Sequence, residues 1–393
     1  MSTATINPPS DLSFDLTEDQ KMIRDSVRDF VQRHVKDGVI ERDESCEFPH
    51  EIVKELGEMG LMGMVHDEKY GGGGVGHVAF ALALEEIARW DASLALTVAS
   101  HTSLCSGHIA IAGTDAQKEK YLTQLTSGEV LGGWGLTEPG SGSDASNMKT
   151  TAVKDGDEWV INGSKIFITQ GSVGGIFVIL AVTDRSKGAK GVSAFIIESD
   201  TPGFSHGPKM KKLGMNSSDT RELTFEDVRI PEDNLLGELG HGFIDTMKVL
   251  DGGRIGIAAI GVGIARGSME ESLRYSHERE QFGKPIYENQ AIKWKVVDIA
   301  VQTDAARLLV HRAAWLCDMG RPYSKEVSMA KLYSSELSTR AALEAIQIHG
   351  GYGYTKEYHV ERFLRDAKLL EIGEGTSEVQ RMVIGRHLSK EVK

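Results

Sequence analysis

Two hydrophobic periodicities alternate along this chain of 393 residues, and they limit what it can fold into. Up to about residue 130, apolar side chains recur at helical spacing. Short β-type runs separated by Gly, Pro, Asp or Ser follow, and helical spacing then returns. Because the chain is too long for one ordinary core, we predict a helical domain at 1–130, a β-domain at 131–236 and a helical domain at 237–393. The expected fold class is α+β and mainly α, with a barrel-like middle domain and a C-terminal four-helix bundle.

The N-terminal part begins with a helix-capping signal. Thr17 followed by Gln20 is a capping box, and apolar residues then follow at helical spacing. Further helices are expected at 51–62, 79–89, 94–112 and 117–125. The run Gly71–Gly74 is tempting as a phosphate cradle, but no Lys-Ser or Lys-Thr follows it. A flexible connector is therefore predicted.

The middle part carries signals for short strands and tight turns. Asp155-Gly156 and Asn162-Gly163 are dipeptides of the type that closes a β-hairpin, so a turn is predicted at each. Short strands joined by such turns are typical of a small barrel. The expected strands lie at 159–161, 177–182, 192–197, 204–207 and 223–228.

The C-terminal part has long segments of helical periodicity, which suggest a bundle. One glycine-rich stretch, Gly261–Gly267, resembles a dinucleotide fingerprint. Its spacing is one residue too long, and no second strand ending in an acid follows about twenty residues on. We interpret Gly256, Ala259, Gly263 and Gly267 as small residues that let helices approach closely. The expected helices lie at 255–277, 289–319, 324–349 and 377–390.

Composition excludes several classes of function. Apolar residues make up 40% and charged residues 26%, as in soluble globular proteins. The net charge of −13 argues against nucleic acid and anionic membranes, and predicts local basic spots wherever a phosphate binds. The three cysteines are far apart, and no histidine has ligand spacing, so neither a disulfide framework nor a metal site is expected. Met1 to Asp15 shows no secretory signal and no apolar stretch reads as a membrane span, so a cytoplasmic protein is predicted.

A carboxylate between two glycines, Glu374, stands just ahead of the last expected helix. Ser377 and Gln380 suggest a capping box, which would direct the positive end of that helix toward Glu374. Burial raises the pKa of a carboxyl group and a helix end lowers it, a combination that could tune a general base. An ordinary cap on an exposed loop is the other interpretation of this stretch alone.

Glycine-rich and polar motifs elsewhere in the chain help to decide whether Glu374 is a general base or an ordinary helix cap. In chain order they are Trp134–Asp144, Lys165–Gly171, Arg279–Pro285 and Gln347–Gly353, followed by Glu374. Together they closely resemble the acyl-CoA dehydrogenase family of flavoproteins, and the resemblance covers nearly the whole chain. It implies the domain order given above, FAD as cofactor and an acyl-CoA thioester as substrate.

The resemblance assigns a role to Glu374. It implies that Glu374 removes the α-proton and that its backbone N–H, with a flavin hydroxyl, holds the thioester oxygen. Some members carry the base on the first long bundle helix instead, but this sequence has Gly252 and Gly253 around that place. Gly373 replaces a tyrosine of many short- and medium-chain members, which leaves the acyl chain length open.

The resemblance also implies the residues that bind the cofactor and the substrate. An arginine suits a diphosphate because its planar fork donates paired hydrogen bonds. Asp251 and Arg254 are expected at the pantetheine and adenine part, although such a pair could equally be a structural salt bridge. The cofactor residues are Trp134, Leu136, Thr137, Gly142, Ser143, Phe167, Thr169, Arg279, Gln281, Phe282, Gln290, Gln347, Gly350, Gly351, Thr376 and Glu378, and the substrate residues are Ser143, Asp251, Arg254 and Gly375.

The implied reaction converts an acyl-CoA, short or short and branched, into a trans-2-enoyl-CoA. Electrons would pass to an electron-transfer flavoprotein, and the subunits would form a homotetramer with Gln347, Gly350 and Gly351 reaching a neighbour's FAD. An oxygen-using oxidase is the near alternative, although its usual form has a longer C-terminal region. A decarboxylating glutaryl-type member would show an altered turn at Thr137–Gly140. A catalytically silent binding or assembly protein is the alternative of a different class.

Overall fold

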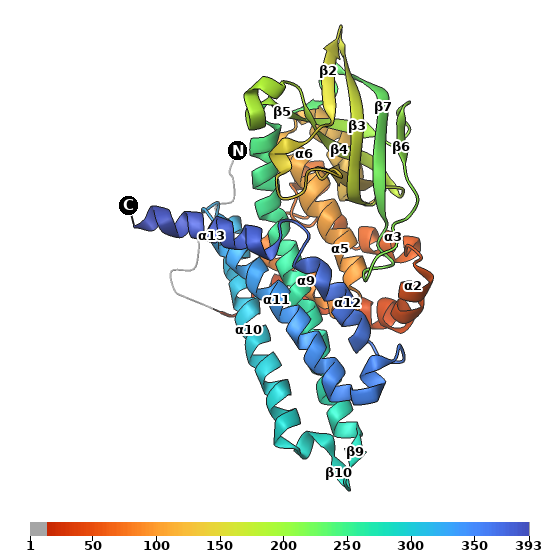
Figure 1. Cartoon of the computed structure of the whole chain (residues 1–393), viewed down its shortest axis with the longest axis vertical. Coiled ribbons are helices and arrows are strands. Elements are labelled where there is room, and N and C mark those ends of the chain that lie inside the picture. The colour runs from red at the N-terminus through yellow and green to blue at the C-terminus, as the bar shows by residue number, and fades with distance from the viewer. Residues whose placement is uncertain (1–13, 393) are drawn as a thin grey trace.

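The computed structural model describes residues 14–392 and shows helices, then a sheet, then helices (Figure 1). This order confirms the predicted fold class. The expectation about a secretory signal falls mainly on residues 1–13, outside the described range. The N-terminal helices are α1 (Glu18–Phe30), α2 (Val39–Ser45), α3 (His50–Glu58), α4 (Gly76–Ala88), α5 (Ala92–Ser100), α6 (Gly107–Ala112), α7 (Asp115–Gln117) and α8 (Thr123–Thr126).

Both N-terminal signals can be located in the structure. The side chain of Thr17 accepts from the backbone N–H of Gln20 and the Gln20 side chain bonds back, so the predicted capping box of α1 is confirmed. The run Gly71–Gly74 connects to α4 through a turn with internal hydrogen bonds, including Gly74 N–H to the carbonyl of His66 at 2.9 Å. A Cβ on Gly72 would overlap that same carbonyl, so the connector is closely packed.

The middle of the chain forms one eight-stranded sheet in the order β6-β7-β3-β2-β4-β5-β8, with β1 added parallel to β4. The short β1 and β2 were not among the expected strands. The strands are β1 (Leu131–Gly135), β2 (Thr151–Asp155), β3 (Glu158–Thr169), β4 (Gly174–Val182), β5 (Val192–Glu198), β6 (Phe204–His206), β7 (Thr220–Pro231) and β8 (Leu235–Leu236).

One of the two predicted turns is wrong. Asp155-Gly156 does close the β2–β3 hairpin, with Gly156 at φ 61°. Asn162-Gly163 instead lies inside β3, where the pairing with β7 shifts register. The Asn162 side chain accepts from the backbone N–H of Asp227 and donates to its carboxylate. Pairing with a long neighbouring strand therefore overrides the local turn preference.

The bundle at the end of the chain differs from the prediction in its fourth helix. The structure has α9 (Gly242–Glu278), the short strands β9 (Glu280–Gln281) and β10 (Lys284–Pro285), α10 (Gln290–Asp318), α11 (Ser324–His349), α12 (Val360–Leu370) and α13 (Ser377–Glu391). The helix α12 was not predicted, and it lies along α9 and α11, whereas α13 crosses the end of α11 (Figure 1). The helix α9 also begins earlier than expected, because Gly252 and Gly253 interrupt its apolar pattern without ending the helix.

The glycines of α9 lie where other helices touch it. A Cβ on Gly263 would come within 2.6 Å of the carbonyl of Glu85 in α4, and one on Gly261 within 2.9 Å of the carbonyl of Ser334 in α11. The segment is continuous helix, so the rejection of a dinucleotide fingerprint is confirmed.

The helices from both ends of the chain share one hydrophobic core. Phe80 and Leu84 of α4 belong to the same buried cluster as Ile260 of α9 and Phe363 of α12. The sheet packs its two faces in separate clusters, one of which includes residues of α6 and α8. The helical part before residue 130 and the helical part after residue 237 are thus one packed body in space.

One helical run is long and apolar enough to cross a membrane by composition. It covers Ala92–Ala112, and 78% of its most apolar window is buried inside the protein. The expectation that no apolar stretch is long enough to cross a membrane is therefore wrong. Because its apolar side chains are already buried in the core, the run has the character of a core helix.

A buried ion pair joins two motifs of the middle domain. Lys165 is fully buried, and its ammonium donates to the carboxylate of Glu138 at 2.8 Å and to the carbonyl of Leu136 at 3.2 Å. Glu138 also accepts from the backbone N–H groups of Lys149 and Thr150. The pair therefore fixes the turn after β1 to the middle of β3.

Replacing Lys165 with Met should destabilise the protein strongly, by about 3–5 kcal/mol, because Glu138 would remain as an uncompensated buried charge. Thermal melting of the purified variant measures the effect. Lys187→Met is the matched control, since its pair with Asp184 is exposed and should contribute less than about 1 kcal/mol. The double variant Lys165→Met with Glu138→Met should recover part of the loss. Equal melting of the Lys165 and Lys187 variants would contradict this account.

Candidate active site

The loop between α12 and α13 holds Glu374 in an uncommon backbone conformation. Glu374 has φ 52° and Gly375 has φ 95°, so two successive residues are left-handed. Such a conformation is unfavourable for a residue with a Cβ, by roughly 1–2 kcal/mol. The ends of the loop are closed by backbone hydrogen bonds, from Gly373 to the carbonyl of Leu369 at 2.8 Å and from Ser377 to that of Glu371 at 2.9 Å.

The cap of α13 is Thr376 and not Ser377, which corrects the prediction. The side chain of Thr376 accepts from the backbone N–H of Val379 at 3.3 Å. Ser377 is the first helical residue, and its buried hydroxyl has no partner within the described residues. The left-handed Gly375 sets this register, because it turns the chain one residue earlier than the Ser-x-x-Gln pattern indicates.

Buried side chains hold the carbonyl groups of this loop. Lys331 of α11 donates to the carbonyl of Gly375 at 2.7 Å. Gln380 donates to the same carbonyl at 2.9 Å and to that of Glu374 at 3.4 Å. Arg254 of α9 adds a long contact of 3.5 Å to the carbonyl of Glu374. The loop is thus fixed from three helices.

The carboxylate of Glu374 lies against α9. A Cβ on Gly253 would come within 3.1 Å of its Cδ and would overlap its Oε2. The residue as a whole is half-buried, but Oε2 is shielded and has no hydrogen-bond partner in the described chain. Burial raises the pKa of Glu374 to about 7, although the cations of Lys331 and Arg254 oppose the rise. As predicted, burial and a nearby positive charge shift the pKa of Glu374 in opposite directions. The positive charge comes from side chains on α11 and α9, however, and not from the end of α13.

Sequence analysis missed Lys331. It is fully buried, and burial lowers the pKa of its ammonium to about 8, while the charge of Glu374 opposes this shift. The only available signal is that Lys331 falls on the buried face of the helix predicted at 324–349, where a lysine is rarely found.

The substrate pair Asp251 and Arg254 forms a salt bridge of 2.6 Å one helical turn apart on α9. Asp251 also lines a hollow of about 550 Å³ together with Arg321, Tyr323 and His387. The two residues therefore do form a structural salt bridge, and Asp251 is at the same time accessible to a ligand from the hollow. The hollow carries the basic groups Arg321, Lys325 and His387 and also the carboxylates of Asp251, Glu326 and Glu391, and Lys325 is paired with the last two.

The first two flavin-type motifs lie side by side. The backbone N–H of Ile166 donates to the carbonyl of Thr137 at 2.8 Å. Next to it, the β3–β7 pairing shifts between Lys165 and Ile168, and Phe167 in this bulge has φ 61° and an exposed fraction of 65%. A large aromatic side chain held outward on a strained backbone indicates a ligand surface.

The remaining residues of these motifs surround the bulge. Trp134 donates from its indole N–H to His108 at 3.1 Å, and Leu136 is buried beneath the turn. Gly142 and Ser143 are exposed on the turn, and Thr169 ends β3. The structure thus brings these predicted residues together at one edge of the sheet.

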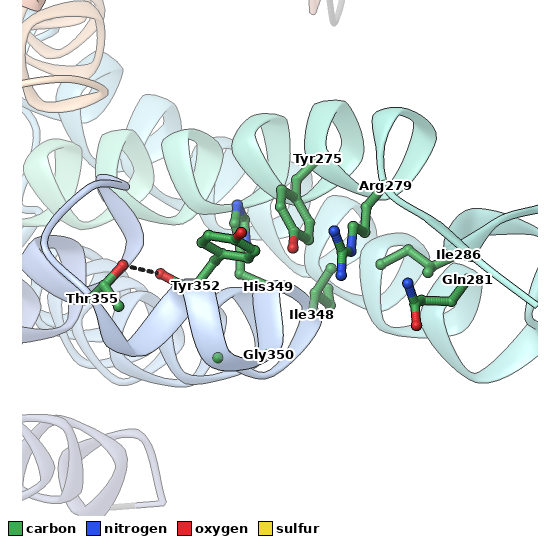
Figure 2. A pocket seen from close by; sticks show the side chains of 10 residues that line it. Tyr275, Arg279, Gln281, Ile286, Ile348, His349, Gly350, Tyr352 and Thr355 are labelled. Carbon is green, nitrogen blue, oxygen red and sulfur yellow. Dashed lines mark hydrogen bonds between the residues drawn. The ribbon is translucent and has the colours of Figure 1, made fainter.

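The other predicted cofactor residues lie far from Glu374. Arg279 and Gln281 follow α9 and share a pocket of about 540 Å³ with Gly350 and Gly351 at the end of α11 (Figure 2). From Arg254 to the end of α9 is about 36 Å at 1.5 Å per residue. Phe282, Gln290 and Gln347 are exposed near the same end, and Phe282 has an exposed fraction of 97% at φ 55°. Thr376 and Glu378, by contrast, lie beside Glu374.

The chemistry of both places fits a flavin nucleotide. The far pocket offers the Arg279 cation for phosphate, the ring of Tyr275, and His349, whose buried Nε2 has no partner in the described chain. The edge of the sheet offers the exposed ring of Phe167 and the free backbone of the turn at Gly142. No group of His, Cys, Asp or Glu within residues 14–392 has the arrangement of a metal site.

Comparison with known proteins agrees with this geometry. The acyl-CoA dehydrogenase N-terminal, middle and C-terminal domain models match residues 17–129, 133–228 and 240–389. The short-chain-specific acyl-CoA dehydrogenase of Clostridium acetobutylicum is 47% identical over 95% of this chain and 98% of its own. The subunit CarC of the caffeyl-CoA reductase–Etf complex of Acetobacterium woodii is 43% identical over 95% and 99%. The structure of butyryl-CoA dehydrogenase from Megasphaera elsdenii superposes with a TM-score of 0.94 at 45% identity, over 96% of this chain and all of the other. The chain belongs to the acyl-CoA dehydrogenase family and is an FAD-dependent oxidoreductase.

Proposed function

We propose that this enzyme interconverts a short acyl-CoA and its trans-2-enoyl-CoA, with Glu374 as the α-proton base. The observation that carries the proposal is the Glu374 carboxylate itself, shielded beside Gly253 and with a pKa of about 7. A base of this pKa is half ionised at neutral pH, where it can both take and return a proton. An exposed capping residue would have neither the shielding nor the raised pKa.

The chain's own groups supply the acid–base and electrostatic parts of the reaction. The backbone N–H of Glu374 makes no hydrogen bond within the described residues, so it is free to donate to the thioester oxygen. The left-handed Gly375 and the donors Lys331 and Gln380 hold this N–H and the carboxylate in a fixed relation. When bound, FAD accepts the hydride from the β-carbon.

The hollow beside Asp251 is the place we assign to the nucleotide end of the substrate. Its basic groups Arg321 and His387 suit the phosphates of CoA, and Asp251 joins it to Arg254 and the catalytic loop. A Cβ on Gly373 would meet nothing closer than 3.6 Å, so this residue leaves room beside the base. A short branched acyl group therefore stays among the candidates, and the relative of known specificity is a short-chain enzyme.

Two features of the bundle support the proposal of a homo-oligomer, a homotetramer by family resemblance. Trp294, Val301, Leu308 and Trp315 repeat every seven residues along α10 and are all exposed, while its other face is buried. A continuous apolar stripe on a long outer helix indicates a protein interface (Figure 1). The far pocket is too distant from this chain's own base, so we assign it to the FAD of a neighbouring subunit.

An electron-transfer flavoprotein is the proposed redox partner, because a relative of 43% identity is part of a complex with such a protein. That relative is named a reductase, so reduction of an enoyl-CoA is the second candidate for the physiological direction. Both directions use Glu374 at the same atom. A cytoplasmic location stays a prediction.

The test of the proposed function is anaerobic loss of flavin absorbance on adding acyl-CoA thioesters to the purified protein. Butyryl-, isobutyryl-, 2-methylbutyryl-, isovaleryl-, hexanoyl- and octanoyl-CoA should differ in rate, with the short members fastest. Glu374→Gln should retain FAD but lose at least about a hundredfold in rate, because the base is gone. If no thioester bleaches the flavin, a catalytically silent binding protein becomes the better interpretation. Substantial turnover by the variant would place the base elsewhere.

The rate should rise with pH through about 7, because only ionised Glu374 takes the proton. Replacing Lys331 with Met removes a cation that lowers the pKa of Glu374, so the rising limb should move to higher pH. The pH profile of kcat/KM measures this, with Lys368→Met as control, since Lys368 is exposed and pairs with Glu371. A merely structural role of Lys331 would reduce the rate equally at every pH.

Gly253→Ala should displace the carboxylate and lower kcat on the order of tenfold or more, since small misplacements of a base are costly. Gly252→Ala is the matched control, because its Cβ would meet nothing closer than the hydroxyl of Tyr323 at 3.9 Å. Gly252→Ala adds a helix-favouring alanine in open space and should not lower the melting temperature, whereas Gly253→Ala should lower it because its Cβ also meets Leu104. Equal activities for the two variants would contradict the proposed position of Glu374.

A further inference from the structure

A cluster of a thiol, an imidazole and a carboxylate lies outside the site described above. The sulfur of Cys317 in α10 lies 3.7 Å from Nε2 of His77, and Nδ1 of His77 lies 2.9 Å from the carboxylate of Asp318. His77 stands at the start of α4, so the cluster joins two helices far apart in sequence. This is the order of groups that activates a cysteine nucleophile, with a base on the sulfur and an acid that orients the base.

The imidazole is held firmly in this orientation. Asp318 accepts from the backbone N–H of His77 at 2.6 Å and from that of Val78 at 3.1 Å, so it also caps α4. Burial would lower the pKa of His77, but Asp318 and Cys317 outweigh it and raise the pKa to about 10. His77 therefore keeps its proton throughout the neutral range and can offer it to the sulfur.

The other groups near the sulfur of Cys317 either donate a hydrogen bond to it, which favours its thiolate form, or carry no net charge. The hydroxyl of Tyr323, in the turn before α11, also bonds to Cys317, and burial raises the pKa of this phenol, so it stays protonated as a donor. His66, in the segment before α4, is buried, and burial lowers its pKa to about 4, so it is uncharged. Asp251 and Arg254 lie beyond Tyr323 and carry opposite charges. The sulfur thus faces two donors.

The turn above the thiol borders a hollow at the surface. Cys317 is partly exposed, and its carbonyl accepts from Gly320, so it lies beneath the turn that carries Gly320 and Tyr323. Both of these residues line the hollow beside Asp251. The other cysteines provide a natural comparison, because Cys46 is exposed without a histidine contact among the described residues and Cys105 is fully buried.

We propose that Cys317 is a reactive thiol site for S-thiolation by low-molecular-weight disulfides, activated by His77 and Asp318. The sulfur of Cys317 attacks one sulfur of the disulfide, a Cys317–S–S bond forms and the S–S bond of the reagent breaks. Cys317 is oxidised, the departing sulfur of the reagent is reduced to a thiolate, and the proton of the Cys317 thiol is released to water while the protonated His77 stays beside the sulfur. No further oxidant is needed. The proposal does not depend on the acyl-CoA reaction.

The test uses the full-length holoenzyme and the aromatic disulfide 5,5′-dithiobis(2-nitrobenzoate), whose released thiolate is followed by absorbance. Cys46→Ser leaves Cys317 as the accessible thiol, and Cys317→Ser leaves Cys46. Between pH 8 and 6 the rate of Cys46, which has no histidine contact among the described residues, should fall more steeply than that of Cys317. The rate of Cys317 should fall less than about threefold over the same range, and at pH 6 it should exceed that of Cys46 at least tenfold.

Adding His77→Gln to Cys46→Ser should restore the steep pH dependence, while the backbone caps of α4 are unaffected. Peptide mapping by mass spectrometry after treatment with oxidised glutathione should find the adduct on Cys317 before Cys46, with none on Cys105. The proposal is overturned if Cys317 follows the pH dependence of Cys46, if His77→Gln changes nothing, or if folded protein carries no adduct on Cys317.

Discussion

The close contact between α9 and the loop of Glu374 is the constraint on which the site depends. Gly253 gives the carboxylate a place against the helix axis, and Gly261 and Gly263 admit α11 and α4 in the same way. One helix with small residues on several faces therefore joins the two helical parts of the chain into a single core and makes room for the base. A side chain at any of these positions would separate elements that must touch for the site to form.

The charge of Glu374 is set by the groups that also fix its position. Burial alone favours the neutral acid, whereas Lys331 and Arg254 favour the carboxylate, and the balance leaves a pKa of about 7. The same lysine and Gln380 bind the carbonyls of the left-handed turn. These buried donors hold the strained backbone in place, so electrostatic tuning and geometry cannot be altered independently here.

Sequence patterns were sufficient for the order of helices and strands, because hydrophobic periodicity is local, and the family resemblance singled out Glu374, which stays the predicted base. They failed where a distant partner decides the outcome. Asn162-Gly163 has the chemistry of a turn, but pairing with β7 keeps it in a strand. Ser377 has the pattern of a cap, but the left-handed Gly375 gives that role to Thr376. Lys331 carries no motif, and its importance arises only from the folding of α11 onto the loop.

The cofactor residues illustrate a further limit of motifs. Phe167 and Arg279 belong to motifs that a family resemblance assigns to one FAD, yet Phe167 lies near the end of β3 that meets the helical core, whereas Arg279 follows the far end of α9. Most of the length of α9 separates the proposed flavin site beside Glu374 from the pocket of Arg279 and Gly350 in the same chain. A second copy, brought in through an apolar face such as that of α10, resolves the conflict because each copy then completes its neighbour's site. The length of α9 supports the proposal that the predicted cofactor groups come from two different subunits.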